Sequence, residues 1–315
     1  MKHLITGAAG FVGSNIAKEL VEKGEEVVGV DCFTDYYSRD LKERNIKELK
    51  NYNNFKFIEA DLLDMDLNKL LKNIDYIYHQ AAQAGVRSSW GQDFEIYSRN
   101  NILLTQKLLE AARESKELKK FVYASSSSVY GDTNKLPMQE DNRLQPVSPY
   151  GVSKLAGENL CYLYYKNFKV PAVSLRYFTV YGVGQRPDMA FHIFIRSFLK
   201  GENIHIFGDG KQSRNFTYVS DIVRANILAA EKGPAGEIIN IGGAGEGIKL
   251  NETLELIKEL TNRETEVIYT DKVKGDVKHT SADISRAENL LNYSPGVDFQ
   301  TGLSREVEWL KNIYL

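Results

Sequence analysis

Residues 2–13 decide the fold, and they read KHLITGAAGFVG. The apolar stretch at 2–6 predicts a short β-strand, and residues 11–23 carry apolar side chains at helical spacing. Between them, the glycines of residues 7–13 suit a tight turn from a strand into a helix, because glycine allows close backbone approach. The start of a helix adds unpaired N–H groups and a partial positive charge. The stretch favours a phosphate-binding turn, although an ordinary strand-to-helix turn has the same composition.

The G-x-x-G-x-x-G spacing is one residue longer than the commonest dinucleotide pattern, but its place at the first strand–helix junction favours a dinucleotide. The residues expected at the diphosphate are Gly7, Gly10, Phe11, Val12 and Gly13. Asp31, at the end of the second strand, is placed to bind both adenosine ribose hydroxyls and to repel a 2′-phosphate, which favours NAD over NADP. The alternative is a solvated turn aspartate. Asp61 and Leu62 are placed to meet the adenine, but Asp61 could equally be a helix N-cap.

Strand-like and helix-like segments alternate through the first half of the chain. The expected strands are 2–6, 26–31, 55–60, 76–79, 121–124 and 172–175, and the expected helices include 11–23, 102–113 and 154–168. This alternation predicts an α/β fold with a doubly wound parallel sheet of the Rossmann type. After about residue 176, glycines and prolines break the rhythm and predict a smaller C-terminal α/β lobe. We expect a nucleotide-binding domain over 1–176 and a substrate lobe over 177–315, with a segment near 216–240 returning to the first domain.

Composition narrows the classes of partner. The chain has 40 Lys and Arg against 42 Asp and Glu, and this net charge of −2 argues against broad electrostatic binding of nucleic acid. The two cysteines, Cys32 and Cys161, exclude a disulfide framework, and the five histidines are scattered, which argues against a metal site. No apolar run approaches the roughly 18 to 20 residues that a membrane span requires. We expect a cytoplasmic protein that binds neither nucleic acid, membrane nor metal.

Residues 148–154 read SPYGVSK and have the form of a helix start, because serine suits the N-cap and proline the first helical position. Tyr150 then lies in the first turn, and Lys154 lies one turn further along the same face. The positive helix end, the ammonium and an oxidised nicotinamide would each lower the pKa of the phenol, so Tyr150 is expected to act as a base near neutral pH. Such a pair also arises by chance in a chain with 18 tyrosines.

Four serines, residues 125–128, distinguish this tyrosine–lysine pair from a chance spacing. They follow the strand at 121–124, and the carboxyl ends of parallel strands are where such folds bind ligands. Hydroxyls there can share a hydrogen bond with a substrate alcohol as its proton leaves. Taken alone, a serine run is more often a polar loop.

Together these residues resemble the extended short-chain dehydrogenase/reductase family, and more narrowly its nucleotide-sugar 4-epimerases. The resemblance extends through the whole chain, with the motifs in the family's order. It is carried by the glycine turn with Asp31 and by residues 79–82, 101, 125–131, 150–154, 175–182, 184–191, 207–210, 214–218 and 275–283. It implies a tightly held NAD that accepts a hydride from a sugar and gives it back.

The resemblance also implies roles for single residues. Tyr150 removes the proton from the sugar O4 while C4 passes its hydride to the nicotinamide, Ser126 hydrogen-bonds O4, and Lys154 holds the nicotinamide ribose. The 4-keto sugar then swings about its diphosphate link and takes the hydride on its other face, with no net oxidation. The further cofactor contacts that it implies are Ala81, Ala82, Asn101 and Tyr177.

The two residues after Ser126 bear on the type of reaction. Related dehydratases and decarboxylases carry acidic residues there, whereas this chain has Ser127 and Ser128. Without those carboxylates, a 4-keto intermediate has no obvious route except return of the hydride, which favours epimerisation. The alternatives are a dehydratase or decarboxylase, and a non-catalytic regulator that binds NAD but has no need of the tyrosine–lysine pair.

A UDP moiety is likewise implied by the resemblance. Arg214 matches the family's diphosphate-binding arginine, which is a bidentate donor suited to phosphate. Asp276 would meet a uridine ribose hydroxyl, and Met189, Phe191 and Phe207 would line the base. A second family arginine is replaced by Val273, and one of the lysines on either side could substitute for it.

Serine, threonine and arginine residues from both halves of the chain bear on the identity of the sugar. Thr179 stands where UDP-galactose epimerases usually have Asn, and it resembles the UDP-glucuronate 4-epimerases. With Ser127 and Ser128 it could seat a C5 carboxylate, with Arg87 or Arg186 nearby, although these arginines could equally hold phosphates or loop carbonyls. We therefore prefer conversion of UDP-glucuronate to UDP-galacturonate, with UDP-glucose/UDP-galactose or an N-acetylated sugar as the alternative.

Two amphipathic stretches, 93–115 and 150–167, match the helices through which this family usually pairs into dimers. Their apolar faces could equally be buried within one subunit. The sequence thus predicts a homodimer without deciding it.

Overall fold

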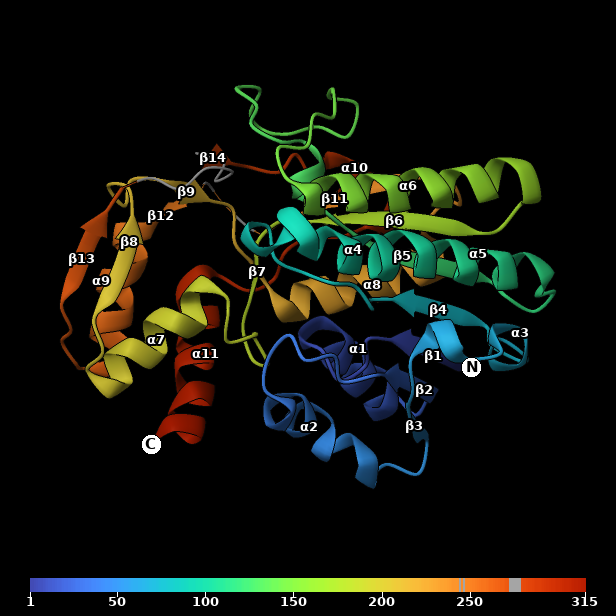
Figure 1. Ribbon diagram of the computed structural model, residues 1–315, viewed down its shortest axis with the longest axis horizontal. Helices are drawn as coiled ribbons and strands as arrows, with labels where there is room; N and C mark the ends of the chain where they lie inside the picture. Colours follow the sequence, from blue (N-terminus) through green and yellow to red (C-terminus); the bar gives the residue numbers. More distant parts are fainter. Residues whose placement is uncertain (244, 246, 272–278) are drawn as a thin grey trace.

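The computed structural model describes residues 1–243, 245, 247–271 and 279–315, and its largest feature is a seven-stranded parallel sheet covered by helices (Figure 1). The strand order is β11-β6-β5-β4-β1-β2-β3, with every neighbouring pair parallel. The strands are β1 (Lys2–Thr6), β2 (Glu26–Asp31), β3 (Phe55–Glu59), β4 (Tyr76–His79), β5 (Lys120–Ser126), β6 (Ala172–Tyr177) and β11 (Ile238–Ile241). The predicted doubly wound α/β fold is confirmed.

Successive side chains of the central strands enter two different cores. Leu4 and Ile77 belong to the apolar cluster on one face, whereas Ile5 and Tyr78 belong to the cluster on the other face. All four are at most 1% exposed. Because side chains alternate along a strand, a parallel sheet covered on both faces needs apolar residues at nearly every position. This is why the strands read as continuous apolar runs in the sequence.

One pair of helices covers each face of the sheet. Helices α1 (Phe11–Glu22) and α8 (Val219–Lys232) pack together on the face of Ile5, and α5 (Leu104–Glu114) and α6 (Pro149–Phe168) on the face of Leu4. The helix expected at 102–113 differs at its start, where a π-helical segment, Ser98–Leu103, precedes α5. The other helical segments here are α2 (Arg39–Lys47), η1 (Leu49–Asn51), η2 (Leu62–Asp64), α3 (Leu67–Leu70), η3 (Arg87–Ser89), η4 (Gly91–Asp93), α4 (Phe94–Tyr97), η6 (Ser127–Val129) and α10 (Ser285–Leu291).

A smaller group of elements lies to one side of the sheet, on the left in Figure 1. The chain leaves the large sheet after β6 and returns to it with α8 and β11. In the smaller group, helices α7, α9 and α11 pack together beside the parallel pair β8–β13. Its elements are β7 (Val180–Tyr181), α7 (Ala190–Lys200), β8 (Ile204–Phe207), β9 (Ser213–Arg214), β10 (Thr217–Tyr218), β12 (Ile248–Lys249), α9 (Leu250–Thr261), β13 (Val267–Thr270), β14 (His279–Thr280) and α11 (Phe299–Tyr314).

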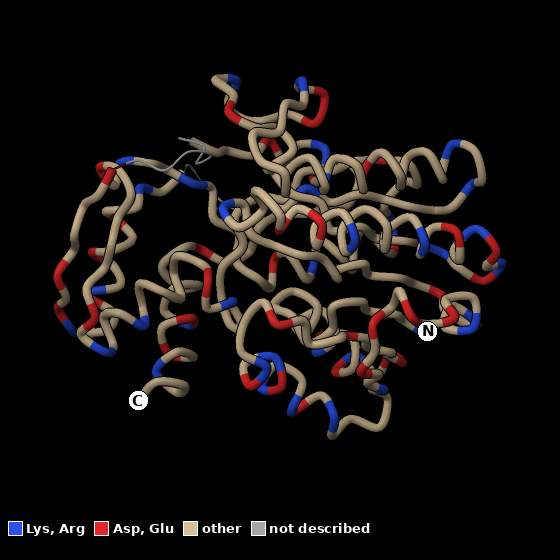
Figure 2. Tube along the Cα trace, in the orientation of Figure 1, with Lys and Arg blue, Asp and Glu red and all other residues tan. Residues whose placement is uncertain are grey.

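Charged residues of both signs are interspersed along the trace (Figure 2). In the part of the chain that the structure describes, no helix is long and apolar enough to cross a membrane. Among the same residues, no group of three His, Cys, Asp or Glu side chains could hold a metal ion.

Candidate active site

A cavity at the carboxyl ends of the parallel strands collects most of the residues predicted to bind a cofactor. Ligands of doubly wound sheets bind at this edge, where the loops leave the strands. The predicted residues that line the cavity are Gly7, Gly10, Phe11, Val12, Gly13, Asp31, Asp61, Leu62, Ala81, Ala82, Tyr150, Lys154, Tyr177 and, from the substrate set, Arg186. The sheet therefore brings together residues that are far apart in the sequence, such as Gly7 and Tyr177, which are 170 residues apart.

The glycine turn leaves room for the diphosphate of a dinucleotide. Gly7 has φ +68°, and a Cβ on it would lie 2.8 Å from the backbone nitrogen of Ala81. A Cβ on Gly13 would lie 2.2 Å from the carbonyl oxygen of Gly7. Helix α1 begins with Gly10 as its N-cap, with no side-chain cap and no acidic residue in its first turn. The N–H groups and positive end of the helix are thus available to an anion, as NAD requires.

The carboxylate of Asp31 and the hydroxyl of Tyr37, both in the cavity lining, also suit a nucleoside. Asp31 is held by the backbone N–H groups of Ala9 (3.0 Å) and Phe33 (2.9 Å), one on each carboxyl oxygen. Burial raises its pKa, and these two hydrogen bonds oppose that shift. Tyr37 lines the same cavity, and its buried hydroxyl has no hydrogen-bond partner among the described residues. Buried polar groups normally have partners, so this hydroxyl fits a site that binds a polar ligand.

Lys42 is a cavity residue that the sequence did not single out. It is 4% exposed although it lies on the highly charged helix α2, and its ammonium donates to the carbonyl oxygen and the hydroxyl of Thr34. It lies over the ring of Tyr37, with 4.6 Å between the ammonium and the ring centre. The signal was weak, because only a lysine and an isoleucine of α2 are buried.

Asp61 is the helix N-cap that one of its two sequence interpretations predicted. One carboxyl oxygen accepts a hydrogen bond from the N–H of Leu63 (2.9 Å), so it is the N-cap of η2, and the other pairs with Arg99 (2.7 Å). It also lines the cavity. The capping bond fixes the Asp61 side chain in the cavity lining, and its contact with adenine stays a prediction.

Helix α6 begins as predicted. The hydroxyl of Ser148 accepts a hydrogen bond from the N–H of Gly151 (3.1 Å), and Pro149 is the first helical residue. Tyr150 therefore lies in the first turn, and Lys154 follows one turn later. The Lys154 ammonium donates to the carbonyl oxygen of Ala124 (2.8 Å), and burial lowers its pKa to about 8.

The expectation of a low pKa for Tyr150 from the chain's own groups was wrong. Burial raises the pKa of the phenol, while the Ser126 hydroxyl and the Arg186 guanidinium oppose the rise. Arg186, and not Lys154, is the cation that lowers the pKa of Tyr150. The Lys154 ammonium instead bonds the Ala124 carbonyl and lies over the Tyr123 ring.

The four serines divide between two tasks. Ser125 donates to the carboxylate of Glu158 (2.5 Å), which forms a buried two-pronged pair with Arg176 (2.8 and 2.9 Å). Ser126 donates to the hydroxyl of Ser128 (3.1 Å) and is the N-cap of η6, which contains Ser127 and Ser128. Ser126 therefore lies next to Tyr150 at the end of β5, whereas Ser125 joins β5 to the pair between α6 and β6.

Comparison with known proteins identifies the family. A model of the NAD dependent epimerase/dehydratase family matches residues 3–242. The chain belongs to this family. A Bacillus subtilis (strain 168) protein named as an uncharacterized UDP-glucose epimerase is 46% identical, over all of this chain and 99% of its own.

Two further relatives carry the name of one reaction. A UDP-glucuronate 4-epimerase of Thermodesulfobacterium geofontis is 39% identical, over 98% of this chain and 96% of its own. The crystal structure of a Bacillus cereus UDP-glucuronic acid 4-epimerase, in complex with UDP-glucuronic acid and NAD, has a TM-score of 0.96 and 46% identity, and the likeness covers all of both chains. NAD is accordingly the cofactor of this epimerase/dehydratase family member.

Asn101 is the predicted cofactor residue that the structure keeps out of the cavity lining. It is 1% exposed in the π-helical segment, where its amide accepts from the N–H of Gln83 (2.7 Å) and donates to Ser153 (2.8 Å). Gln83 itself lines the cavity. Asn101 thus fixes the loop after β4 against helix α6 rather than facing the cofactor of this epimerase/dehydratase protein.

The predicted substrate residues of this family member are more dispersed. Arg186 pairs with Asp188 through two nitrogens (2.9 and 3.0 Å), and the guanidinium carbon of Arg87 lies 4.7 Å from the ring centre of Phe207. Phe191 is 2% exposed and packs in an aromatic cluster with Tyr181, Phe216 and Phe299, so it is a core residue. Met189 is the N-cap of α7, Thr179 lies between β6 and β7, and Arg214 lies on β9. Asp276 and Val273 lie outside the described residues.

Proposed function

We propose that this protein is an NAD-dependent 4-epimerase that interconverts UDP-glucuronate and UDP-galacturonate. The observation that carries the proposal is the meeting of Tyr150, Lys154 and the glycine turn in one cavity, in a chain similar over its whole length to a UDP-glucuronic acid 4-epimerase. A protein that only bound NAD would need the turn and Asp31 but no buried phenol beside a serine hydroxyl.

The chain's own residues would handle the proton and the sugar. Tyr150 takes the proton from O4 as the C4–H bond breaks, and it returns that proton when the bond reforms on the other face. Ser126 would hydrogen-bond O4 in both directions, and Lys154 would hold the nicotinamide ribose. NAD, when bound, supplies the hydride acceptor and, in its oxidised form, a positive charge that favours the phenolate.

The same cavity supports epimerisation over elimination. Loss of water or carbon dioxide from a 4-keto sugar needs an acid or base beside the sugar. The two residues that follow Ser126 are Ser127 and Ser128, whose hydroxyls do not ionise near neutral pH. The 4-keto sugar therefore returns to a 4-hydroxy sugar, with either configuration at C4.

Preference for a glucuronate rests on hydroxyl and guanidinium donors. Ser127, Ser128 and Thr179 offer hydroxyl groups that suit a C5 carboxylate, with Arg87 and Arg186 as the nearby cations. We propose that Arg214, Met189, Phe207 and Asp276 hold the UDP moiety. The second candidate, interconversion of UDP-glucose and UDP-galactose, is favoured by the name of the Bacillus subtilis relative.

Incubation with a panel of UDP-sugars, without added NAD, tests the proposal. We expect UDP-glucuronate and UDP-galacturonate to reach the same mixture from either side, as measured by anion-exchange chromatography. UDP-glucose should react more slowly, because it has no carboxylate for the serine and arginine donors. A product lighter by water or carbon dioxide in mass spectrometry would contradict epimerisation, and faster reaction of UDP-glucose would favour the second candidate.

We also propose that the two groups of elements act as two lobes, a NAD-binding lobe over 1–176 and a UDP-sugar lobe over 177–315. Residues 219–241 belong in space to the first, since α8 and β11 complete the large sheet. The cavity receives Arg186 from the second lobe and the glycine turn from the first. A sugar bound between them would be reached by groups of both.

We propose that the protein forms a homodimer through an apolar surface on α4, the π-helical segment and α6. The large apolar side chains between 45% and 50% exposed on α4, the π-helical segment and α6 are Ile96, Leu103, Val152, Tyr162, Leu163 and Phe168. Helix α6 packs against both α4 and the π-helical segment, so these side chains lie on neighbouring elements that could pair with a copy of themselves. Sedimentation equilibrium should give twice the mass of one chain.

The compartment is proposed to be the cytoplasm. Cys32 and Cys161 are both unpaired, and unpaired thiols persist in a reducing compartment. Fractionation of the source cells with an antibody to the protein tests this location.

A further inference from the structure

Side chains join the loop after β2 to the loop after β7. The hydroxyl of Tyr36 donates to one carboxyl oxygen of Asp188 (3.1 Å). Arg186 donates to both oxygens of the same carboxylate, from Nε (2.9 Å) and Nη2 (3.0 Å). The guanidinium carbon of Arg186 lies 5.8 Å from the centre of the Tyr36 ring. Tyr36 and Arg186 both line the cofactor cavity, so this chain of bonds runs along its wall.

The loop after β7 is also fixed at its other end, against the helix that begins at the glycine turn. The side-chain amide of Asn15, on α1, donates to the carbonyl oxygen of Val183 (3.0 Å). A Cβ on Gly184 would lie 3.3 Å from the same amide and 3.5 Å from the ring of Phe11. The segment from Val183 to Asp188 thus lies across the start of α1, the part of the fold that suits the diphosphate.

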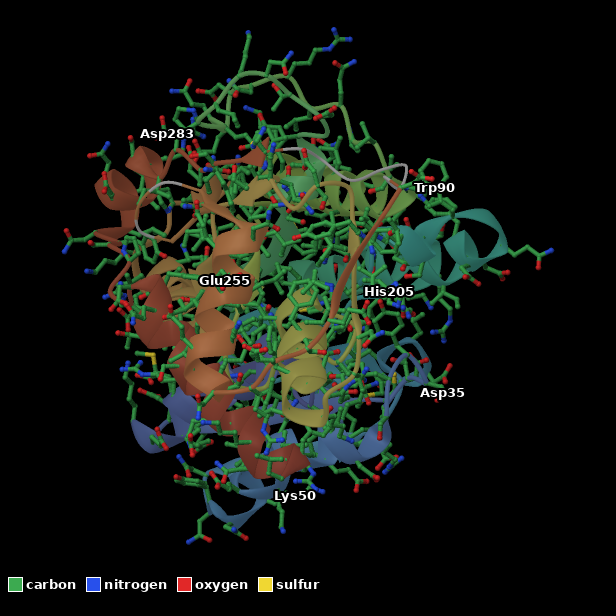
Figure 3. The ribbon with its side chains drawn as sticks, turned by 90° about the vertical axis from the view of Figure 1, so that its left-hand side faces the viewer. Asp35, Lys50, Trp90, His205, Glu255 and Asp283 are labelled. Carbon is green, nitrogen blue, oxygen red and sulfur yellow. The ribbon has the colours of Figure 1, made fainter. Side chains whose placement is uncertain are left out.

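A third loop closes the arrangement from the side of β4. An added Cβ on Gly85 would lie 2.4 Å from the hydroxyl of Ser88 and 2.5 Å from that of Tyr36. Ser88 in turn bonds the hydroxyl of Tyr97 (2.9 Å), which donates to the carbonyl oxygens of Ala84 and Gly85. Asp35, Trp90 and His205 of β8 lie in the same half of the view in Figure 3.

The charges favour this bridge at neutral pH. Burial opposes ionisation of Asp188, but the hydrogen bonds and charge of Arg186 lower its pKa, so it stays a carboxylate. Burial and the charge of Asp188 raise the pKa of Tyr36, so its hydroxyl stays a donor. Hydrogen bonds to a charged group are the stronger kind. The side chains of Arg186 and Asp188 are 21% and 33% exposed, so water weakens the bridge only in part.

We propose that Tyr36, Asp188 and Arg186 form a latch that retains NAD in the cavity between turnovers. Release of the dinucleotide requires the loops after β2 and β7 to separate, and the Tyr36–Asp188 bond is what joins them. An enzyme that returns a hydride to the molecule that gave it gains from slow cofactor release. Tyr36 and Asp188 are positioning residues here, since neither is assigned to the reacting atoms. The latch depends on NAD binding and not on which sugar reacts.

Exchange of labelled NAD measures the latch directly. The full-length protein is loaded with radiolabelled NAD, chased with an excess of unlabelled NAD, and sampled by rapid filtration. We expect Tyr36→Phe and Asp188→Asn each to release the label about 10-fold faster, because each weakens a charge-assisted hydrogen bond. The double variant should be no faster than Asp188→Asn alone, because both changes break the same link.

The controls separate a latch from general damage. Tyr52→Phe removes a tyrosine hydroxyl that bonds the exposed carboxylate of Glu22 (3.5 Å), outside the cavity lining, and should leave release unchanged. Excess NAD should restore the turnover of Tyr36→Phe without a change in KM for the UDP-sugar, because this variant leaves the pair of Arg186 and Asp188 in place. If Tyr36→Phe fails to fold by circular dichroism, Asp188→Asn alone carries the test.

Two results overturn the latch: unchanged release in Asp188→Asn, or effects in the two single variants that simply multiply in the double variant. The outcome is independent of the proposed reaction. If the wild-type protein holds NAD but epimerises no UDP-sugar, the proposed function fails while the release rates still decide the latch.

Discussion

In the cofactor half of the site, Gly7, Asp31 and Ala81 lie at the carboxyl ends of three neighbouring strands of one sheet. In the substrate half, Arg87, Arg186 and Arg214 come from the short helix η3, a loop and a two-residue strand. The register of a parallel sheet fixes where each strand ends, so side chains after those ends must meet. No such rule fixes how loops of the smaller lobe pack. Changes in the first half should therefore affect NAD, and changes in the second half should affect the UDP-sugar.

The largest effect is expected where the two halves touch the reacting atoms. Tyr150→Phe removes the proton acceptor and should lower kcat by about 1,000-fold or more, since a positioned acid–base group contributes typically 10²–10⁴-fold. NAD content should stay at the wild-type level, because the ring still fills its place. Tyr165→Phe, on the same helix but outside the cavity lining, is the matched control. Turnover of Tyr150→Phe at the wild-type rate would remove this residue from the chemistry.

A second change breaks the cofactor half alone. In Gly13→Ala the new methyl group would lie 2.2 Å from the Gly7 carbonyl oxygen, so the turn must shift. Overpacking of this kind costs roughly 1–3 kcal/mol, which corresponds to roughly 5- to 150-fold weaker NAD binding by calorimetry. Gly10→Ala is the paired variant, because its methyl group would lie 3.1 Å from the same oxygen and a small movement relieves it. Equal losses in both variants would argue against the close approach at Gly13.

A third change addresses the substrate half. Arg214→Lys keeps the positive charge but loses the planar fork that suits a diphosphate. We expect KM for the UDP-sugar to rise about 10-fold, with NAD content and kcat nearly unchanged, since one bidentate contact is weakened. Arg263→Lys, exposed in the turn after α9 of the same lobe, should have no effect. Loss of NAD from Arg214→Lys would contradict the assignment of NAD binding to the cofactor half and UDP-sugar binding to the substrate half.

The same division explains which sequence predictions held. The glycine turn, Asp31 and the start of α6 are local patterns with one stable geometry each, and the structure has them where the sequence indicated. Phe191 is different, because an aromatic residue on a helix suits a core as well as a base-binding wall, and only packing decides. The pKa of Tyr150 depends on where the Lys154 ammonium goes, and the Ala124 carbonyl that takes it is 30 residues away in the sequence.

Contacts between distant loops were not predictable from local patterns. Tyr36 lies 152 residues from Asp188, and neither residue belongs to a spacing that signals a bond. The buried pair of Glu158 and Arg176 is similar, since each residue sits in an otherwise apolar or mixed element. Such pairs are set by tertiary packing, which a single sequence does not display.

The smallest effect on catalysis is expected from two buried carboxyl groups, one in each lobe, which bear on stability. Glu158 is paired with Arg176, whereas Glu306 of α11 is 0% exposed and its carboxyl oxygens have no hydrogen-bond partner among the described residues. Burial raises the pKa of Glu306 well above its usual 4.5, and the backbone of Gly182 opposes this only in part. Below pH 4.5 the folded and unfolded chains are both protonated at this residue, so it carries no penalty.

As pH rises above 4.5, the unfolded chain loses this proton while the folded chain keeps it, so the stability of the wild-type protein falls. Glu306→Gln cannot ionise, and its advantage in free energy of unfolding should therefore grow between pH 5 and pH 8 in urea titrations. Glu158→Gln is the opposite case: it leaves the buried Arg176 guanidinium uncompensated and should destabilise by about 3–5 kcal/mol. If the advantage of Glu306→Gln stayed constant across pH, the Glu306 carboxyl group would have to reach water or a hydrogen-bond partner. The contrast with the paired Glu158 would then be wrong.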